Sequence, residues 1–360
     1  MRRVRRRDHN LVGAFTVLMA LGVLSCGGAG AGTGGGAANS PNSPITGIEK
    51  AGTYSSFVSA ARDVIAEGNY AYVATYTSGS AVGGVAVVDV SNKASPSLIG
   101  SYFPSLSAYR LYASYIVKSG SYVYIDGGSV RAFAKVDVST PSSPSLVYQL
   151  SGSYSPILAV DGPTLYLSCF STYELRAYDV SDTLSPLLLT TYTNSGDRLY
   201  YVLAESGYVY LSDSTAHTTQ VLQMSSNRQS LTKVAEYDGF GSMNKAGNYL
   251  YILNFFTGMP SAQLQVVDVS NPAAPVKKGS VDTGRASSDD LRVAQGCAFV
   301  AANGLIDLYD VADPANPHLI TSFSDSSLQS MNGISICDDY VYVADGGGGS
   351  GKLRIYHMLK

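Results

Sequence analysis

Tryptophan is absent from this chain of 360 residues, and histidine is scarce, with four copies. Apart from one in the N-terminal leader, the histidines are His217, His318 and His357, which lie far apart with no regular spacing. A zinc site or a Ser-His-Asp triad needs histidine beside its partner residues, so neither is expected. The sequence also lacks a G-x-S-x-G elbow and a D-x-D-x-D-G calcium loop. We therefore expect no catalytic residue, no metal and no cofactor.

Charged residues are few as well, at 14% of the chain, and the formal net charge is −3. Five arginines belong to the leader, so the chain without it is more acidic still. A nucleic-acid surface needs clustered lysine and arginine, so a nucleic-acid partner is excluded. Low charge together with 37 glycines and 27 tyrosines is typical of a turn-rich all-β protein.

The first 25 residues predict an export signal. Arginines at positions 2, 3, 5, 6 and 7 precede an apolar run from Leu11 to Leu24. This run is too short to span a bilayer of about 30 Å as a helix, so it is interpreted as a secretory signal. The stretch ending at Cys26 resembles a bacterial lipobox, which implies lipidation of Cys26. Leu24 is unusual at its position in that motif, so cleavage by an ordinary signal peptidase stays open.

Residues 26–46 follow as a tether. Between Gly27 and Pro44 the chain contains only Gly, Ala, Thr, Asn, Ser and Pro, a composition that cannot bury apolar surface. We expect this stretch to be disordered and to hold a domain off a membrane. The predicted location is extracytoplasmic, on the outer membrane or cell surface, with a lipid anchor as the membrane contact.

The remainder, residues 47–360, repeats itself about every 42–48 residues. One phrase recurs as VAVVDVSNKASP (85–96), FAKVDVSTPSSP (133–144), LRAYDVSDTLSP (175–186), LQVVDVSNPAAP (264–275) and IDLYDVADPANP (306–317). A second phrase, such as GNYAYVA (68–74) or GNYLYIL (247–253), precedes each copy. Two worn copies, at 206–230 and 338–360, bring the number of units to seven. A period of this length, built from short alternating strands, predicts an all-β, seven-bladed β-propeller.

Each unit aligns as four antiparallel strands, here called A to D from the centre outward. The last unit ends after its strand C, whereas residues 48–54 resemble a strand D. We therefore predict that residues 48–54 pair with residues 353–357 and close the ring. The aspartate that ends strand C, at positions 89, 137, 179, 268 and 310, is expected to accept N–H bonds in the following turn. Its repetition favours this structural role over catalysis.

The phrases VVDVSNPAAP and LYDVADPANP resemble LVIVD repeats, which occur in bacterial and archaeal surface proteins predicted to form β-propellers. The resemblance covers about 310 residues. Gln223 and His357 depart from it, because they occupy the aspartate position in the fourth and seventh units. That family has no single established activity, so the resemblance implies a fold and a surface location.

Three cysteines follow Cys26. Cys297 and Cys337 lie in adjacent units near the same turn, which makes them the best candidates for a disulfide in an exported protein. The alternative interpretation is that Cys169, Cys297 and Cys337 are buried free thiols.

The alignment also predicts which face could carry a site. The D–A and B–C loops share one face, and they differ from unit to unit, as specific binding requires. Asp63, Tyr115, Tyr201 and Asp290 occupy the start of strand A, at the mouth of the expected central channel. Phe255 and Phe256 lie in a long B–C loop and predict either a contact patch or packing over a blade edge. Salt pairing of Asp63 and Asp290 with nearby arginines is the alternative to an acid–base role.

Three functions are compatible with these features. The first is a monomeric, lipid-anchored binding or scaffolding module with an unidentified protein or glycan partner. The second is a propeller enzyme, such as a hydrolase, lyase or quinoprotein, with its site at the channel. The third is a structural envelope protein. An enzyme should bring several titratable side chains together on the loop face.

Overall fold

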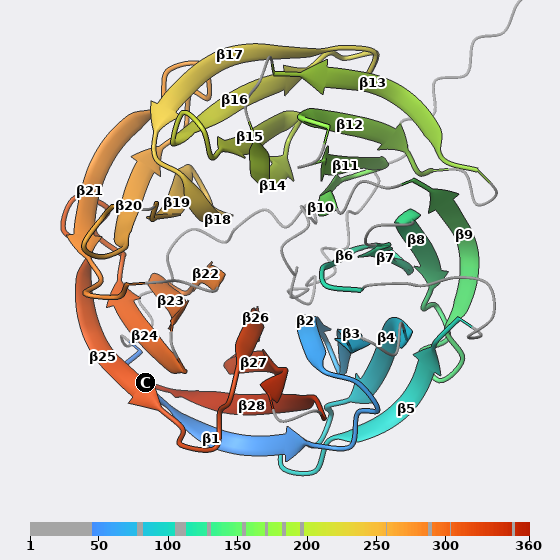
Figure 1. The fold of residues 1–360 in the computed structure, drawn as a ribbon. Coiled ribbons are helices and arrows are strands. Elements are labelled where there is room, and N and C mark those ends of the chain that lie inside the picture. Colours follow the sequence, from blue (N-terminus) through green and yellow to red (C-terminus); the bar gives the residue numbers. More distant parts are fainter. Residues whose placement is uncertain are drawn as a thin grey trace, which may run out of the picture.

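The computed structural model describes residues 45–360, except 78–81, 105–112, 128–130, 153–155, 170–171, 182–184, 195–197, 257, 287–289, 303 and 348–349. These residues form seven four-stranded sheets arranged as the blades of a ring (Figure 1). The prediction of an all-β, seven-bladed propeller is therefore confirmed. No helix among the described residues has the length and hydropathy needed to cross a membrane.

Each blade contains four strands, which are named here by their order from the centre of the ring outward. The innermost strands are β2 (Ala61–Glu67), β6 (Ile116–Ser119), β10 (Pro156–Asp161), β14 (Leu199–Glu205), β18 (Gly241–Ala246), β22 (Asp290–Ala294) and β26 (Met331–Cys337). The second strands are β3 (Tyr70–Thr77), β7 (Tyr122–Asp126), β11 (Thr164–Cys169), β15 (Tyr208–Asp213), β19 (Tyr249–Asn254), β23 (Cys297–Ala302) and β27 (Tyr340–Asp345). The third strands are β4 (Val82–Asp89), β8 (Arg131–Asp137), β12 (Glu174–Asp179), β16 (Thr218–Met224), β20 (Gln263–Asp268), β24 (Leu305–Asp310) and β28 (Lys352–Leu359). The outer strands are β5 (Ser97–Tyr102), β9 (Ser145–Ser151), β13 (Leu187–Thr193), β17 (Leu231–Asp238), β21 (Val276–Asp282), β25 (His318–Ser324) and β1 (Gly47–Tyr54).

The two innermost strands of each blade are joined by a two-residue turn. In four blades its first residue is a glycine with φ between 54° and 57°, namely Gly68, Gly120, Gly162 and Gly247. A side chain at these four positions would meet no atom within 4 Å, so the backbone conformation, not lack of space, favours glycine there.

The turn between the third and outer strands is held by the repeated aspartate. Oδ1 of Asp89 accepts a hydrogen bond from the backbone N–H of Ser91 at 2.8 Å. The same bond joins Asp137 to Ser139, and Asp179 to Ser181. Asp268 and Asp310 make it as well, with Ser270 and Ala312. The structural interpretation of these five aspartates is confirmed.

The hydrophobic core lies between neighbouring blades, because an inner strand buries side chains on both of its faces. Between the seventh and first blades, for example, Val73 of β3 packs in one cluster with Ile355 of β28. Between the sixth and seventh, Phe299 of β23 packs with Val341 of β27. Successive residues of one strand thus support different interfaces.

The seventh blade takes its outer strand from the start of the domain. β1 pairs antiparallel with β28, with Ile48 opposite Met358 and Tyr54 opposite Leu353. In Figure 1, β1 lies outside β28 and covers its edge. The predicted closure is confirmed. Ile45 and Thr46, which composition assigned to the tether, also join the fold, because Ile45 is 2% exposed and Thr46 donates to the carbonyl of Leu359.

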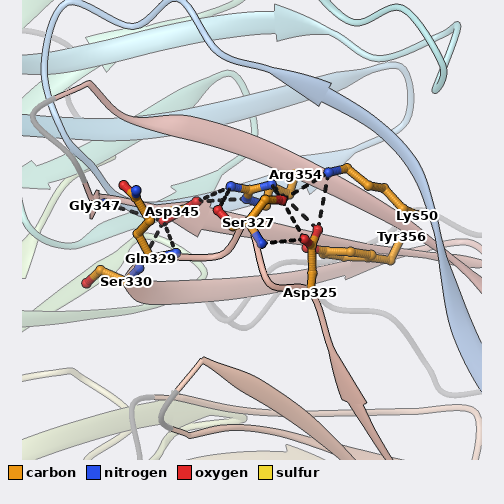
Figure 2. Close-up of polar contacts among 9 residues, drawn as sticks. All are labelled: Lys50, Asp325, Ser327, Gln329, Ser330, Asp345, Gly347, Arg354 and Tyr356. Carbon is orange, nitrogen blue, oxygen red and sulfur yellow. Dashed lines mark hydrogen bonds and ion pairs between the residues drawn. The ribbon is translucent and has the colours of Figure 1, made fainter.

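A buried ion-pair network lies under this closure (Figure 2). Arg354 of β28 is 1% exposed, and its Nε donates to Oδ2 of Asp345 at 2.7 Å. Its Nη1 donates to Oγ of Ser327 at 2.6 Å. Asp325 lies beside Ser327 and accepts from the hydroxyl of Tyr356 at 3.1 Å.

Lys50 connects β1 to the same network. Its Nζ lies 3.2 Å from Oδ2 of Asp325 and 3.3 Å from Oγ of Ser327. Burial opposes the ionisation of Asp325, yet hydrogen bonds from Ser327 and the charge of Lys50 hold the pKa of its carboxyl well below the usual value. The N-terminal strand is thus attached by charge as well as by its backbone ladder.

The expected disulfide between Cys297 and Cys337 is not formed, because Cys297 is a buried free thiol. Cys297 packs in the core between the sixth and seventh blades. Cys337 packs in the core between the seventh and first blades. The sheet of the seventh blade separates the two clusters, so the side chains lie on opposite faces of it. Cys169 is also a buried free thiol, and burial raises its pKa to about 12.

Candidate functional site

The site builds up where the innermost strands begin, on the face that carries the D–A and B–C loops, here called the loop face. Asp63 of β2, Tyr201 of β14 and Asp290 of β22 stand at or near this end of their strands, and Tyr115 directly precedes β6. Figure 1 shows these four strands around the centre of the ring. The sequence-predicted residues therefore share one region.

Bulges alter the innermost strands here. The β2–β3 register shifts between Ala61 and Asp63, and the β14–β15 register shifts between Leu199 and Val202. The first bulge contains Arg62, whose guanidinium lies over the ring of Tyr76 at 5.8 Å. The second contains Tyr200 and Tyr201 as consecutive residues. A bulge turns side chains away from the regular alternation, and such bulges are frequent beside functional sites.

Asp63 and Asp290 make the same bonds in two different blades. Oδ1 of each accepts the N–H of the next residue at 2.8 Å, from Val64 and from Leu291. Oδ2 of each reaches the innermost strand of the following blade, at Ile116 N (3.1 Å) and at Ile334 N (2.9 Å). These carboxylates therefore connect neighbouring blades.

The two aspartates differ in how their charge is balanced. Nη1 of Arg292 lies 2.6 Å from Oδ1 of Asp290, which confirms the salt-pairing interpretation for that residue. Asp63 has no ion pair among the described residues. It packs instead against Gly333, where a Cβ would come 2.4 Å from its Oδ1.

Asp126 joins this region although the sequence did not single it out. It ends β7, is 4% exposed, and its Oδ1 accepts the backbone N–H groups of Ser114 at 2.5 Å and Tyr115 at 2.7 Å. Three consecutive N–H groups, from Ser114 to Ile116, thus bond to the carboxylates of Asp126 and Asp63. Together the two aspartates fix the backbone of Tyr115.

Burial perturbs the titration of this group. It raises the pKa of Asp63 to about 7; Arg292 opposes the rise and Asp290 adds to it. Burial also raises the pKa of Asp126 to about 7, against the N–H bonds from Tyr115 and Ser114 and with a contribution from Asp63. The pKa of Tyr115 is raised by burial first and then by Tyr200 and Tyr201. These side chains therefore lie within electrostatic reach of one another.

Five rings continue from Tyr115 across the loop face and form what we call the aromatic cluster: Tyr200, Tyr201, His217, Phe240 and Phe256. The centroids of Tyr200 and Tyr201 are 4.9 Å apart, and Phe240 lies 6.0 Å from Tyr201. His217 lies 6.2 Å from Phe240 and stacks on Phe256 at 4.0 Å with an interplanar angle of 11°. All five residues are partly exposed, and these contacts link their rings across the fourth and fifth blades.

Polar residues at the ends of second strands hold the backbone at Tyr115 and at rings of the aromatic cluster. Asp126 holds the backbone of Tyr115, and Oδ1 of Asn254 accepts the N–H of Phe240 at 2.9 Å. Oδ1 of Asp213 accepts from Thr215 and Ala216, just before His217. His217 itself has φ of 57°, a conformation that is costly for a non-glycine residue and is often found at functional sites. The recurrence of Asp or Asn at this position was the sequence signal that could have revealed these residues.

Phe255 and Phe256 have different surroundings. Phe255 packs against the core cluster between the fifth and sixth blades, beside residues such as Leu264 and Leu291. Phe256 stacks on His217. The alternative of packing over the blade edge therefore holds for Phe255, and Phe256 alone joins the surface rings.

No group of three or more His, Cys, Asp or Glu side chains suited to holding a metal ion occurs in the part of the chain that the structure describes. At the loop face, the carboxylates of Asp63, Asp126 and Asp290 accept hydrogen bonds from backbone N–H groups. The arrangement combines partly exposed aromatic rings with carboxylates that accept backbone N–H groups.

The model of the LVIVD repeat matches residues 59–103, 112–152, 246–283, 286–325 and 330–349. The matches cover the first, second, fifth and sixth units and part of the seventh. The third unit is not matched, although it contains the phrase LRAYDVSDTLSP. No curated protein matches the chain.

Many solved structures are similar to this fold. The periplasmic gluconolactonase PpgL of Pseudomonas aeruginosa is 14% identical, with a TM-score of 0.59 over 81% of this chain and 86% of that one. The WD40 domain of Neurospora crassa Pan2 is 10% identical, with a TM-score of 0.61 over 88% and 97%. The WD40 domain of Toxoplasma gondii coronin is 9% identical, with a TM-score of 0.58 over 88% and 90%. At such identities the similarity shows the fold alone.

Proposed function

Because the chain belongs to the family of LVIVD-repeat proteins and forms a seven-bladed propeller, we propose that it is a binding module that captures a protein partner on its loop face. The observation that supports this best is the aromatic cluster. Its rings come from the innermost strands and loops of two blades and are positioned by buried polar side chains. Aromatic side chains with few rotatable bonds give large contact area at low entropic cost.

The face opposite the loop face is less suited to specific binding, which supports the same proposal. It carries the turns in which Asp89, Asp137, Asp179, Asp268 and Asp310 repeat one hydrogen bond. A surface that repeats around a ring presents nearly the same chemistry in each blade. Among the described residues this combination of rings is found in one place only, so it can specify one partner.

Site-specific photo-crosslinking tests the proposal. A photo-reactive phenylalanine analogue replaces Phe256 in the full chain, and a second variant carries it at Ser91 on the opposite face. We expect protein adducts in envelope preparations from position 256 and none from position 91. These adducts should disappear when Tyr201→Ala is added. Equal labelling from both positions, or adducts that glycosidases digest and proteases do not, would contradict a protein partner on this face.

The envelope location is part of the proposal. The predicted signal, lipidation site and tether would hold the propeller outside the cytoplasm, where a partner in the envelope could reach the loop face. Cys26 and the tether up to Pro44 lie outside the described residues.

A propeller enzyme is the second candidate, and one observation favours it. Asp63 and Asp126 have pKa values near 7, the range in which a general acid or base is most effective. One similar structure is a gluconolactonase. Lactone hydrolysis by the purified chain that is lost in Asp63→Asn and in Asp126→Asn would support this function. Hydrolysis that survives in both variants would show that these carboxyls do not catalyse it.

A further inference from the structure

The segment from Ser114 to Ile116 is held by carboxylates from two blades. Each of its three backbone N–H groups donates to a carboxylate, two to Asp126 and one to Asp63. The carbonyl of Tyr115 also accepts the N–H of Asp126 at 3.3 Å. Tyr115 lies in the middle of this segment, within electrostatic reach of Tyr200 and Tyr201. The position of its ring therefore depends on two acidic side chains from two blades.

Among the residues that the structure describes, few charged and titratable groups face these two carboxyls. Asp290 and Arg292 of β22 face Asp63, and they are paired with each other at 2.6 Å. Asp126 and Asp63 face one another, and Tyr115 faces both. Arg62, beside Asp63 on β2, is turned over the ring of Tyr76. Among the described residues, no cation forms an ion pair with either carboxyl.

We propose that Asp126 and Asp63 form a proton-dependent latch, which holds Tyr115 beside the aromatic cluster below neutral pH and releases it above. The geometry allows Asp126 to carry a proton in the held form, whereas a proton on Asp63 shares its oxygen with a bond from Val64 or Ile116. Oδ1 of Asp126 accepts both N–H bonds, so Oδ2 can be protonated without loss of either. Ionisation of both carboxyls places two like charges in a buried site, and opening the segment hydrates them.

The sign of the effect follows from linkage. Burial raises the pKa of both carboxyls to about 7 in the held form, whereas a hydrated aspartate has a value near 4. The held form therefore binds protons more tightly than the released form. Its stability is full at low pH and is lost as pH rises through about 7. From about pH 6 to about pH 8, opening should become roughly tenfold more frequent for each carboxyl that titrates.

The latch would regulate the proposed binding face, and that consequence rests on the proposed function. Capture of a partner should weaken above neutral pH, because Tyr115 no longer supports the rings beside it. The latch itself can be measured without any partner. A pH-dependent segment with no effect on capture would contradict the proposed function alone.

Hydrogen exchange of the unmodified full chain is the first test. After correction for intrinsic exchange rates, protection of the amides from Ser114 to Ile116 should fall at least tenfold between about pH 6 and about pH 8. Asp63→Asn and Asp126→Asn are neutral and nearly isosteric, so each should reduce this dependence, and the double variant should abolish it. Asp161→Asn is the control, since Asp161 accepts Gly207 N at 2.7 Å between blades on the opposite face.

A fluorescent variant gives a second, independent measurement. The chain has no tryptophan, so Tyr115→Trp introduces a single reporter at the latch. Its emission should shift to longer wavelength, and iodide should quench it more strongly, above about pH 7. Three results would overturn the latch: constant protection across this range, an unchanged dependence in the double variant, or loss of the dependence in Asp161→Asn.

Discussion

Arg354 and Asp345 form an ion pair inside the seventh blade, with Nε to Oδ2 at 2.7 Å and both side chains about 1% exposed (Figure 2). The carboxylate also accepts the N–H groups of Gln329 and Ser330, so it is satisfied on several sides. The guanidinium continues to Ser327 and Asp325, which Lys50 of β1 contacts. One buried arginine thus connects the loop before β26 to the strand that closes the ring.

Replacement of Arg354 by methionine should be strongly destabilising. It leaves Asp345 buried without its cation, a change that costs about 3–5 kcal/mol in comparable sites. The lower midpoint should appear in urea denaturation followed by circular dichroism. Lys233→Met is the control, because Lys233 pairs with Glu236 at the surface, where such pairs contribute about 0–1 kcal/mol. Equal midpoints for the two variants would show that the buried network adds little.

Removal of residues 45–55 should lower the melting temperature sharply. The deletion takes away β1, exposes the edge of β28 and removes Lys50 from the Asp325 network. Deleting residues 30–40, an equal length of the predicted tether, should leave the melting temperature unchanged. The closure would not be important for stability if scanning calorimetry gave one transition temperature for both deletions.

Stability should increase as pH falls from about 8 to about 6. The folded-state pKa values of Asp63 and Asp126 are raised to about 7, so folding binds protons in this range. The gain is about 1 kcal/mol for each carboxyl. The aspartates of the outer turns act in the opposite direction only near pH 4 and below, since N–H bonds from the turn lower the pKa of Asp89. Denaturation midpoints across this range in the wild type and in Asp63→Asn/Asp126→Asn measure the difference; parallel profiles would exclude these groups.

Phe255 and Phe256 should respond differently to truncation. Phe255→Ala removes packing against the core and should cost about 2–3 kcal/mol, somewhat less than for a fully buried phenylalanine. Phe256→Ala removes a surface stack on His217 and should change stability by less than about 1 kcal/mol while it weakens capture of the proposed partner. A large stability loss in Phe256→Ala would place that ring in the core and remove it from the binding face.

Cys26→Ala should leave an unprocessed or released protein. Globomycin blocks the lipoprotein signal peptidase, so treated cells should accumulate the unprocessed precursor of the unmodified chain. Fractionation followed by immunoblotting measures both. A processed Cys26→Ala protein with unchanged membrane attachment after a salt wash would contradict the lipid anchor.

Most of the fold could be predicted from the sequence because the fold consists of repeated units. The same strand and turn pattern recurs in each unit, as in the phrases that contain Asp89 and Asp268. Seven copies of a pattern that would be weak alone therefore support one prediction. The closing strand was also predictable, since residues 48–54 resemble the outer strand that the last unit lacks.

The site was predictable only in part. Alignment of the units brought Asp63, Tyr115, Tyr201 and Asp290 to one end of the ring, which the structure bears out. It did not reveal Asp126, because Asp or Asn ends the second strand in only some of the units, and the sequence does not show that this side chain bonds to the loop before the innermost strand.

The direction of individual side chains was the second feature that the sequence did not predict. Cys297 and Cys337 lie near one turn in the alignment, but they pack on opposite faces of a sheet. Phe255 and Phe256 are neighbours in sequence, yet one packs in the core and the other lies at the surface. In each case the direction depends on twist and loop path, which a single sequence does not specify.

The pairing of β1 with β28 also sets an order of events during synthesis. Some 300 residues separate Ile48 from its partner Met358, so β1 is made first and its partner strand last. At about 5–20 residues per second, β1 has no partner for roughly 15–60 s. Through that interval the first six blades can assemble one after another from local contacts, while the ring remains an open arc. Cooperative folding of the whole domain is then established in one late step, when β28 of the seventh blade pairs with β1.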